Sequence, residues 1–294
     1  MTAVSWHVDP ICTRLAGRFG EPISLGEPEV NWDDRVVVRG ILPGGIRVVI
    51  KVDLNASRHA RELCGLSAAR ASGAPTANVV FVDSNTPGLI VLSEVATSDS
   101  LATTDSISHW RAAGRGLRLL HDGTIPDQML MFQGGRGDWK THILEWSKFE
   151  CTWAERHGKL TPAEYQLCTE HLTSRFSSLG RPSPVIIHGD IQARHVLING
   201  HDVVFVDFGD TGWGDSTWDL VVLTHWHPAR RQAVLEGYEA EASERRRLEQ
   251  FGSAYSLLRH LMVARWYSEN EFDPERSLAA ARLLIDRLPV VSNQ

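Results

Sequence analysis

The sequence has few cysteines, no long apolar run and no excess of basic residues. No apolar stretch approaches the roughly 20 residues that a membrane-spanning helix needs. Residues 1–20 lack the basic start and apolar centre of a signal peptide. Reduced, mostly buried thiols are expected, because the cysteines are widely spaced without a CxxC pair, unlike a disulfide framework or a zinc site. They are Cys12, Cys64, Cys151 and Cys168. We therefore expect a cytoplasmic protein with no membrane partner.

The charge balance is slightly acidic. Thirty Lys and Arg residues against 36 Asp and Glu residues give a formal net charge of −6. This argues against a dedicated nucleic-acid-binding protein, although a local basic groove would escape the test. With 43% hydrophobic and 22% charged residues, the composition is that of a globular protein and excludes disordered, collagen-like and coiled-coil chains. A length of 294 residues suggests two domains or one bilobal unit.

The first third of the chain, about residues 20–96, has the pattern of a small antiparallel sheet with one helix. Val36–Arg39 and Ile46–Val52 are β-branched runs on either side of Pro43-Gly44-Gly45, which indicates a hairpin. Ala56–Ser72 is rich in helix-forming residues. Two further strands are predicted at Val79–Asp83 and Leu89–Glu94. We expect residues 1–96 to form an N-terminal lobe that ends in a hinge at about 93–97.

Residues 98–294 have a mainly helical pattern and are predicted to form the C-terminal lobe. Helices are expected around Ile107–Leu120 and Trp139–Trp153, after a capping box at Thr161–Glu164, and after Asp273-Pro274. A short β insert interrupts these helices, and its loops should meet at one edge. Its strands are Val185–His188, Val196–Ile198 and Val203–Asp207.

Two polar segments accompany these short strands, at residues 188–195 and 207–210. Phosphoryl transfer needs a carboxylate that orients the acceptor hydroxyl and ligands that hold magnesium on the nucleotide phosphates. Asp190 is the candidate for the first role, and His195 and Asp207 are the candidate metal ligands.

The reaction also needs a lysine on the triphosphate, itself held by a carboxylate. Lys51 lies near the end of a predicted strand, and Glu62 follows eleven residues later inside the predicted helix. They form a plausible lysine–glutamate pair.

Taken together, these motifs resemble the aminoglycoside phosphotransferase family, relatives of the eukaryotic-type protein kinases. The resemblance runs from about Val36 to about Leu223 and is carried by three motifs. They are HGD ending at Asp190, DFGD starting at Asp207, and Gly214-Asp215 followed by Trp218-Asp219-Leu220. It implies an α+β, bilobal, protein-kinase-like fold, with a small antiparallel-sheet N-lobe and a larger helical C-lobe.

The resemblance also implies how the nucleotide binds. Mg²⁺ and ATP or GTP would lie between the lobes, with the base against a hinge at Glu94, Val95 and Ala96. His195 stands where most members carry asparagine, which is similar to aminoglycoside 2″-phosphotransferases and macrolide phosphotransferases, both associated with GTP. The phosphate-covering loop would be Gly26–Asp33, which has only one glycine.

Other residues are assigned by their position near these loops. His188 and Asp219 are predicted to support the catalytic loop structurally. Asp210 and Asp215 are candidates for binding a cationic acceptor. Trp213, on a predicted loop, could stack on a ring of the acceptor or simply pack in the core.

We therefore expect a small-molecule kinase that phosphorylates a hydroxyl of an antibiotic, first of all an aminoglycoside-type compound, and so confers resistance. A macrolide or a sugar or amino-alcohol metabolite is the alternative acceptor. An aminoglycoside would need an acidic pocket and a macrolide a broad apolar one. A non-catalytic nucleotide-binding protein is the alternative of another class. A protein kinase is disfavoured because no APE-like motif lies between Asp207 and Asp219. The oligomeric state is left open.

Overall fold

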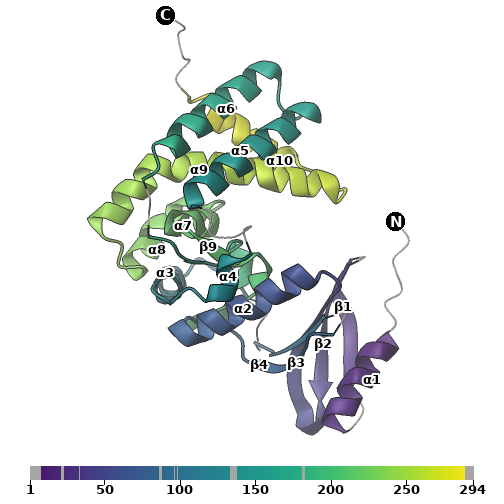
Figure 1. The fold of residues 1–294 in the computed structure, drawn as a ribbon. Coiled ribbons are helices and arrows are strands. Elements are labelled where there is room, and N and C mark those ends of the chain that lie inside the picture. Colours follow the sequence, from purple (N-terminus) through teal and green to yellow (C-terminus); the bar gives the residue numbers. More distant parts are fainter. Residues whose placement is uncertain are drawn as a thin grey trace, which may run out of the picture.

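The computed structural model describes residues 8–20, 23–32, 34–85, 88–95, 97, 99–132, 138–180 and 183–288. Within this part of the chain, the N-terminal region is a five-stranded antiparallel sheet with the strand order β1-β2-β3-β5-β4 (Figure 1). The strands are β1 (Ser24–Trp32), β2 (Arg35–Leu42), β3 (Ile46–Asp53), β4 (Val79–Asp83) and β5 (Gly88–Ser93). Two helices, α1 (Val8–Phe19) and α2 (Ala56–Ser72), accompany the sheet.

Side chains on the two faces of this sheet have different surroundings, because they alternate along each strand. Val48, Ile50 and Val52 are fully buried in a core that also contains Ile11 and Leu15 of α1. Because successive side chains on a strand point to opposite faces, the residues between them on β3 face away from α1. This alternation puts the side chain of Lys51 on the face toward the rest of the protein.

The hairpin, the four predicted strands and the helix over 56–72 are confirmed, but two N-terminal expectations were wrong. The region has a second helix, α1, whose Ile11, Leu15 and Phe19 recur every four residues and pack on the sheet. Moreover, residues 26–32 of the expected loop lie in strand β1, and Asp33 lies outside the described residues. Register shifts around Pro28 allow a proline in this edge strand.

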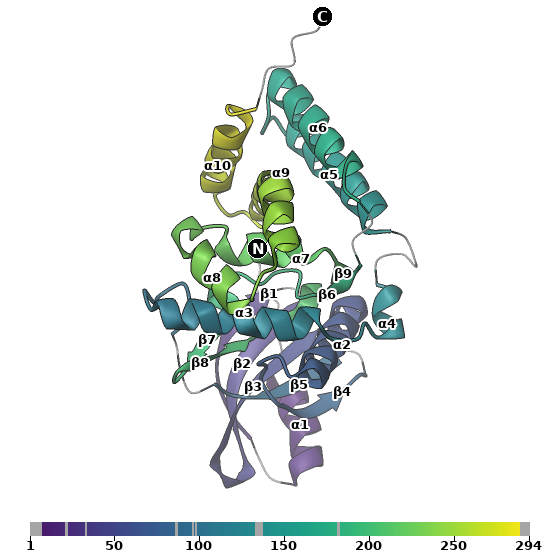
Figure 2. The same cartoon turned by 90° about the vertical axis from the view of Figure 1, so that its left-hand side faces the viewer.

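The C-terminal region is helical, with two short two-stranded sheets (Figure 2). The sheets pair β6 (Val185–Ile187) with β9 (Gly212–Gly214) and β7 (Val196–Asn199) with β8 (Asp202–Phe205). The helices are α3 (Ile107–His121), α4 (Asp127–Leu130), α5 (Trp139–Arg156), α6 (Pro162–Ser177), α7 (Ser216–Thr224), α8 (Arg231–Gly237), α9 (Ala242–Glu269) and α10 (Glu275–Ile285). None of the described helices is long and apolar enough to cross a membrane.

The predicted helices of this region are confirmed, including the capping box at Thr161 and Glu164. The long helix α9 was not predicted. It contacts α5, α6, α7 and α10, so its buried residues are distributed around the helix and leave no single apolar stripe. Figure 1 shows α9 between α7 and the α5–α6 pair.

Candidate active site

A cleft of about 1470 Å³ lies between the sheet and the helical region. It is lined by β2, β3 and β5 on one side, and by α5, α9 and the loops around residues 189–195 and 207–210 on the other. Pockets for one small ligand usually measure about 300–1,000 Å³. The cleft therefore has room for two small molecules side by side.

A buried ion pair lies on the sheet side of the cleft. Lys51 Nζ donates a hydrogen bond to Glu62 Oε1, and both residues are buried. Lys51 Nζ also donates to Asp207 Oδ1 at 3.2 Å. The sheet and helix α2 thus bring Lys51 and Glu62 together, as the sequence spacing suggested.

Asp207 lies just after β8 in a strained conformation. Its φ is +68°, in the left-handed region that non-glycine residues rarely adopt. Arg35 Nη2 donates to Asp207 Oδ1 at 2.5 Å. Burial opposes ionisation of this carboxyl, but the charges of Lys51 and Arg35 outweigh burial and hold its pKa well below the ordinary value. Arg35 was missed by the sequence analysis; it lies at the start of β2 and pairs with Asp53 of β3, two residues beyond Lys51.

Asp190 lies at the floor of the cleft and is held by a second arginine that the sequence analysis missed. Arg259 of α9, only 3% exposed, donates through Nη2 to Asp190 Oδ1. Gln192 Nε2 donates to Asp190 Oδ1 at 2.9 Å. Burial works against ionisation, but the charge of Arg259 outweighs it and lowers the pKa of Asp190. The sequence did contain a signal for a buried arginine, because Arg259 is surrounded by Leu257, Leu258 and Leu261.

The His195 ring is oriented by the backbone. Its Nδ1 donates to the carbonyl of Asp190 at 2.7 Å, which leaves Nε2 as the nitrogen that carries the lone pair. Arg194 Nε donates to that Nε2 at 3.2 Å, in agreement with this tautomer. Nε2 lies 3.8 Å from Asp207 Oδ2.

Asp207 and His195 together suit a divalent cation that is bound partly by the protein and partly by its substrate. Mg²⁺ is usually bound through one or two carboxylates together with substrate phosphates. Asp207 supplies the preferred oxygen and His195 an unprotonated nitrogen. Within the described residues, no group of three or more His, Cys, Asp or Glu side chains could hold a metal ion. The phosphates would have to complete the coordination.

The loop that carries Asp190 is supported from below by Asp219 of α7. Its carboxylate accepts hydrogen bonds from the backbone N–H groups of His188 at 2.7 Å and Gly189 at 3.0 Å. Trp218 Nε1 donates to the Gly189 carbonyl at 2.8 Å. The His188 ring is fully buried, donates to the Val206 carbonyl at 3.1 Å, and has its pKa lowered by burial. These contacts fix the backbone immediately before the catalytic candidate Asp190.

The expected hinge follows β5. The Glu94 carboxylate accepts hydrogen bonds from Arg47 and Arg39, and these bonds lower its pKa. Its backbone N–H donates to the Arg47 carbonyl at 3.1 Å. Glu94 and Val95 line the cleft, whereas Ala96 lies outside the described residues.

Of the three acceptor-binding candidates, only Asp210 lines the cleft. Burial and the nearby carboxylates of Asp190 and Asp207 raise the pKa of Asp210. Trp213 is 5% exposed in β9, so the prediction of a loop there was wrong. Asp215 is 1% exposed and accepts hydrogen bonds from Arg247 and Tyr255. Both side chains are buried in the interior of the protein, so neither Trp213 nor Asp215 is among the residues that line the cleft.

The helical side of the cleft is instead rich in aromatic rings. Trp266 of α9 is central: its ring centroid lies 5.7 Å from that of Trp32 on β1 and 5.6 Å from that of Phe272. Contact between Trp32 and Trp266 joins the sheet to the helical region across the cleft. Further aromatic residues of the lining are Phe132, Trp139, Trp146, Phe149, Trp218 and Tyr267.

The antiparallel sheet with its Lys51–Glu62 pair, above a helical region that carries Asp190 and Asp207, defines the class of kinase-like phosphotransferases. The sequence profile of the phosphotransferase enzyme family matches residues 32–251, and the chain belongs to this family. It is thus a phosphotransferase, an enzyme of the transferase class. No curated protein sequence matches the chain.

Solved structures share the fold at low sequence identity. A choline/ethanolamine kinase family protein from Mesorhizobium loti is 17% identical with a TM-score of 0.67, over 95% of each chain. A thermostable mutant of aminoglycoside phosphotransferase APH(4)-Ia, in a ternary complex with ADP and hygromycin B, is 15% identical with a TM-score of 0.65, over 94% of this chain and 98% of that chain. A candidate fructosamine-3-kinase from Thermobifida fusca is 19% identical with a TM-score of 0.68, over 94% and 98%. These similarities support the α+β kinase-like fold.

Proposed function

We propose that this protein transfers the γ-phosphoryl group of ATP or GTP to a hydroxyl of a small molecule with a largely apolar, ring-containing body. The observation that carries the proposal is the aromatic lining around Trp266 on the Asp190 side of the cleft. A macrolide-type antibiotic has this character, so we propose macrolide O-phosphorylation and resistance as the leading role. The donor is a nucleoside triphosphate, and we therefore also propose that the enzyme works in the cytoplasm.

The residues divide into two groups around the transferred phosphoryl. Lys51, fixed by Glu62, holds the inner phosphates, and the base lies near Glu94 and Val95. Asp190 orients the acceptor hydroxyl and receives its proton, which its lowered pKa permits because the carboxylate is ionised at neutral pH. Asp207 and His195 would hold Mg²⁺, which when bound neutralises charge on the triphosphate.

Charge in the cleft argues against a polycationic acceptor. Beyond Asp190 and Asp207, the helical side of the lining has Asp210, Glu145 and Asp273 as its acidic residues. Arg194, Arg259 and Arg265 line the same side. An aminoglycoside would need a clear acidic excess, whereas stacked rings bind apolar ring systems and sugars through their faces. The cleft therefore favours the macrolide-type alternative over the aminoglycoside that the family resemblance suggested first.

The decisive experiment measures release of ADP and GDP by the purified protein with magnesium, across macrolides, aminoglycosides, sugar alcohols and amino alcohols. We expect a macrolide-type compound to stimulate release and to gain the mass of one phosphate. Stimulation by aminoglycosides alone would overturn the acceptor assignment. Tight nucleotide binding without turnover of any compound would favour the non-catalytic alternative.

Replacing Trp266 with alanine tests the aromatic lining. The central ring of the Trp32–Trp266–Phe272 group is lost, so we expect KM for the acceptor to rise about tenfold, which corresponds to about 1.4 kcal/mol. KM for the nucleotide should stay unchanged. Trp153→Ala is the matched control, since Trp153 stacks on His157 and is not among the lining residues. An equal rise of the acceptor KM in both variants would contradict the assignment.

Replacing Arg259 with methionine tests how Asp190 is kept ionised. Arg259 lowers the pKa of Asp190 against the effect of burial, so its removal should raise that pKa. The acid limb of the kcat/KM profile, where Asp190 becomes protonated, should then move to higher pH. Arg246→Met, at an exposed position of the same helix, should leave the limb in place. A uniform loss of activity at every pH in Arg259→Met would indicate a purely structural arginine.

A further inference from the structure

Arg194 lies in the active-site cleft beside the proposed metal ligands. It belongs to the short helical turn Ala193–His195, four residues after Asp190, and it is exposed and lines the cleft. Its Nε donates to His195 Nε2 at 3.2 Å, and that nitrogen lies 3.8 Å from Asp207 Oδ2. The guanidinium group is therefore one hydrogen bond away from the nitrogen that we propose as a magnesium ligand.

Arg194 differs from the other arginines of the cleft in its partners. Most of the others form an ion pair with an Asp or Glu side chain. These are Arg35, Arg39, Arg58, Arg259 and Arg265. Arg61 lies over the Phe132 ring and donates to the Phe132 carbonyl at 3.3 Å. Within the described part of the chain, Arg194 has no carboxylate partner, and only its Nε donates, to an unprotonated ring nitrogen of His195. Its remaining N–H groups are left for a ligand.

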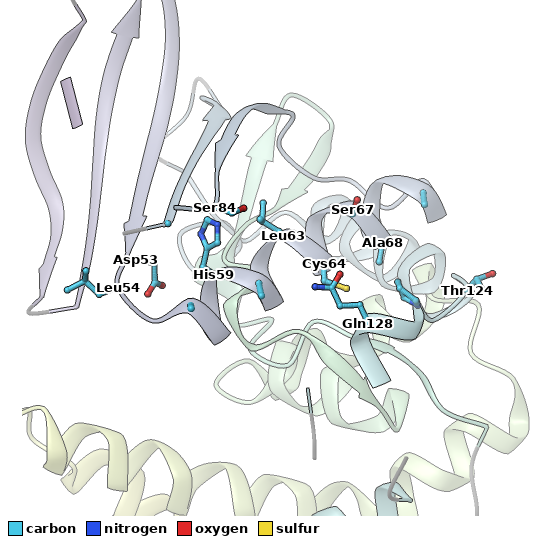
Figure 3. Close-up of a pocket in the computed structure, with 15 residues that line it drawn as sticks. Asp53, Leu54, His59, Leu63, Cys64, Ser67, Ala68, Ser84, Thr124 and Gln128 are labelled. Atoms are coloured by element: carbon cyan, nitrogen blue, oxygen red, sulfur yellow. The ribbon is translucent and has the colours of Figure 1, made fainter. Parts of the chain in front are cut away.

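A second hollow of the protein shows the more usual pairing of a lining charge. This hollow lies beside helix α2, and its lining includes the carboxylate of Asp53 (Figure 3). That carboxylate accepts hydrogen bonds from Arg58 Nη2 at 2.9 Å and from the backbone N–H of Asn55 at 2.7 Å. The charge of Asp53 is thus balanced inside the protein, whereas no carboxylate of the described chain balances the charge of Arg194.

The position of Arg194 indicates a phosphate group as its partner. In kinases the metal ion bridges oxygens of the β- and γ-phosphates, so a group beside a metal ligand also lies beside these phosphates. Guanidinium groups form charge-assisted, often bidentate hydrogen bonds with phosphate, which are roughly twice as strong as neutral ones. A phosphate oxygen is therefore a better acceptor for Arg194 than His195 Nε2. Because Arg194 is exposed and has no ion pair to break, the change of partner costs little.

We propose that Arg194 is a further catalytic residue of the phosphoryl transfer and binds the γ-phosphate of the nucleoside triphosphate. The inference rests on the proposed function, since it requires a triphosphate in the cleft. When the triphosphate binds, Arg194 exchanges its hydrogen bond to His195 Nε2 for hydrogen bonds to γ-phosphate oxygens. The lone pair of Nε2 is then available.

During transfer, the bond between the γ-phosphorus and the oxygen that bridges it to the β-phosphate breaks. The bond between the γ-phosphorus and the acceptor oxygen forms, and the proton of the acceptor hydroxyl goes to Asp190. Arg194 keeps its own protons throughout. Its fixed positive charge stabilises the negative charge on the equatorial oxygens of the transferred group, which is how an arginine accelerates phosphoryl transfer.

Calorimetric titration of the full chain, with magnesium, tests the γ-phosphate contact without turnover. The probes are ADP and GDP, together with AMP-PNP and GMP-PNP, which add the third phosphate. Arg194→Met removes the charge and keeps a long side chain, so we expect affinity for the triphosphate analogue to fall about tenfold. Affinity for the diphosphate should stay unchanged. The control is Arg115→Met, since Arg115 is exposed on α3 and is not among the lining residues.

Turnover separates catalysis from binding. With the acceptor found in the release assay, we expect kcat of Arg194→Met to fall about 10²–10³-fold, the cost of losing one donor to developing charge. Arg194→Lys, which keeps a point charge, should recover part of both losses. Equal weakening of diphosphate and triphosphate binding in Arg194→Met, or a wild-type kcat, would overturn the role of Arg194 alone. A wild-type protein that binds none of the four nucleotides would overturn the proposed function as well.

Discussion

Replacing Asp190 with asparagine is expected to lower kcat by about 10²–10⁴-fold, the range found for loss of a general base. The amide has nearly the same shape as the carboxylate, but it cannot take the proton of the acceptor hydroxyl. Nucleotide affinity should change little, because the proposed function assigns nucleotide binding to Lys51 and Asp207 and not to Asp190. Steady-state kinetics and nucleotide titration measure the two quantities separately.

The control for this substitution is Asp202→Asn. Asp202 is exposed at the start of β8, so its replacement should change neither kcat nor nucleotide affinity. Asp190→Asn also leaves Arg259 without its ionic partner, and a parallel unfolding curve shows whether stability has changed. An Asp190→Asn enzyme with wild-type kcat would refute the assigned role of the carboxylate.

Replacing Gly189 with alanine is expected to destabilise the protein by about 2–5 kcal/mol and to abolish transfer. Gly189 has a φ of +86°, which costs an L-residue roughly 1–2 kcal/mol. An added Cβ would also come within 2.2 Å of the Asp210 carbonyl oxygen. Relief of that clash would cost about 1–3 kcal/mol more and would displace the loop before Asp190. Urea unfolding gives the free energy, and nucleotide release gives the activity.

Gly200→Ala is the control that separates the cost of backbone strain at a positive φ from the cost of the steric clash. Gly200 has a φ of +63°, but a Cβ there would meet no atom within 4 Å. Its replacement should therefore cost only the backbone strain, about 1–2 kcal/mol, and leave activity intact. Equal destabilisation by the two substitutions would mean that the contact between Gly189 and Asp210 can relax freely.

Local patterns in the sequence were sufficient for much of the fold and for part of the site. Alternation along β3 determines which face Lys51 occupies, and the hydrogen-bonding capacity of Thr161 and Glu164 starts α6. These features depend on neighbours within a few residues. The polar segments around Asp190 and Asp207 follow directly after short strands, so their position on loops could also be predicted.

The tertiary structure decided which side chains contact the predicted site residues. Arg35 lies 172 residues from Asp207, and Arg259 lies 69 residues from Asp190, and no local pattern encodes such pairings. Trp213, which the sequence put on a loop, is a buried strand residue because β9 pairs with β6.

The aromatic side of the cleft, for which we propose acceptor binding, was likewise outside the reach of sequence patterns. Trp32 and Trp266 come from opposite ends of the chain, and each alone is compatible with core packing. Only the approach of β1 to α9 makes them neighbours across the cleft. The sequence by itself determined the class of chemistry, because the reacting groups lie in contiguous motifs. The tertiary structure decided the aromatic character of the cleft, because its walls are assembled from a strand and helices that meet only in the folded chain.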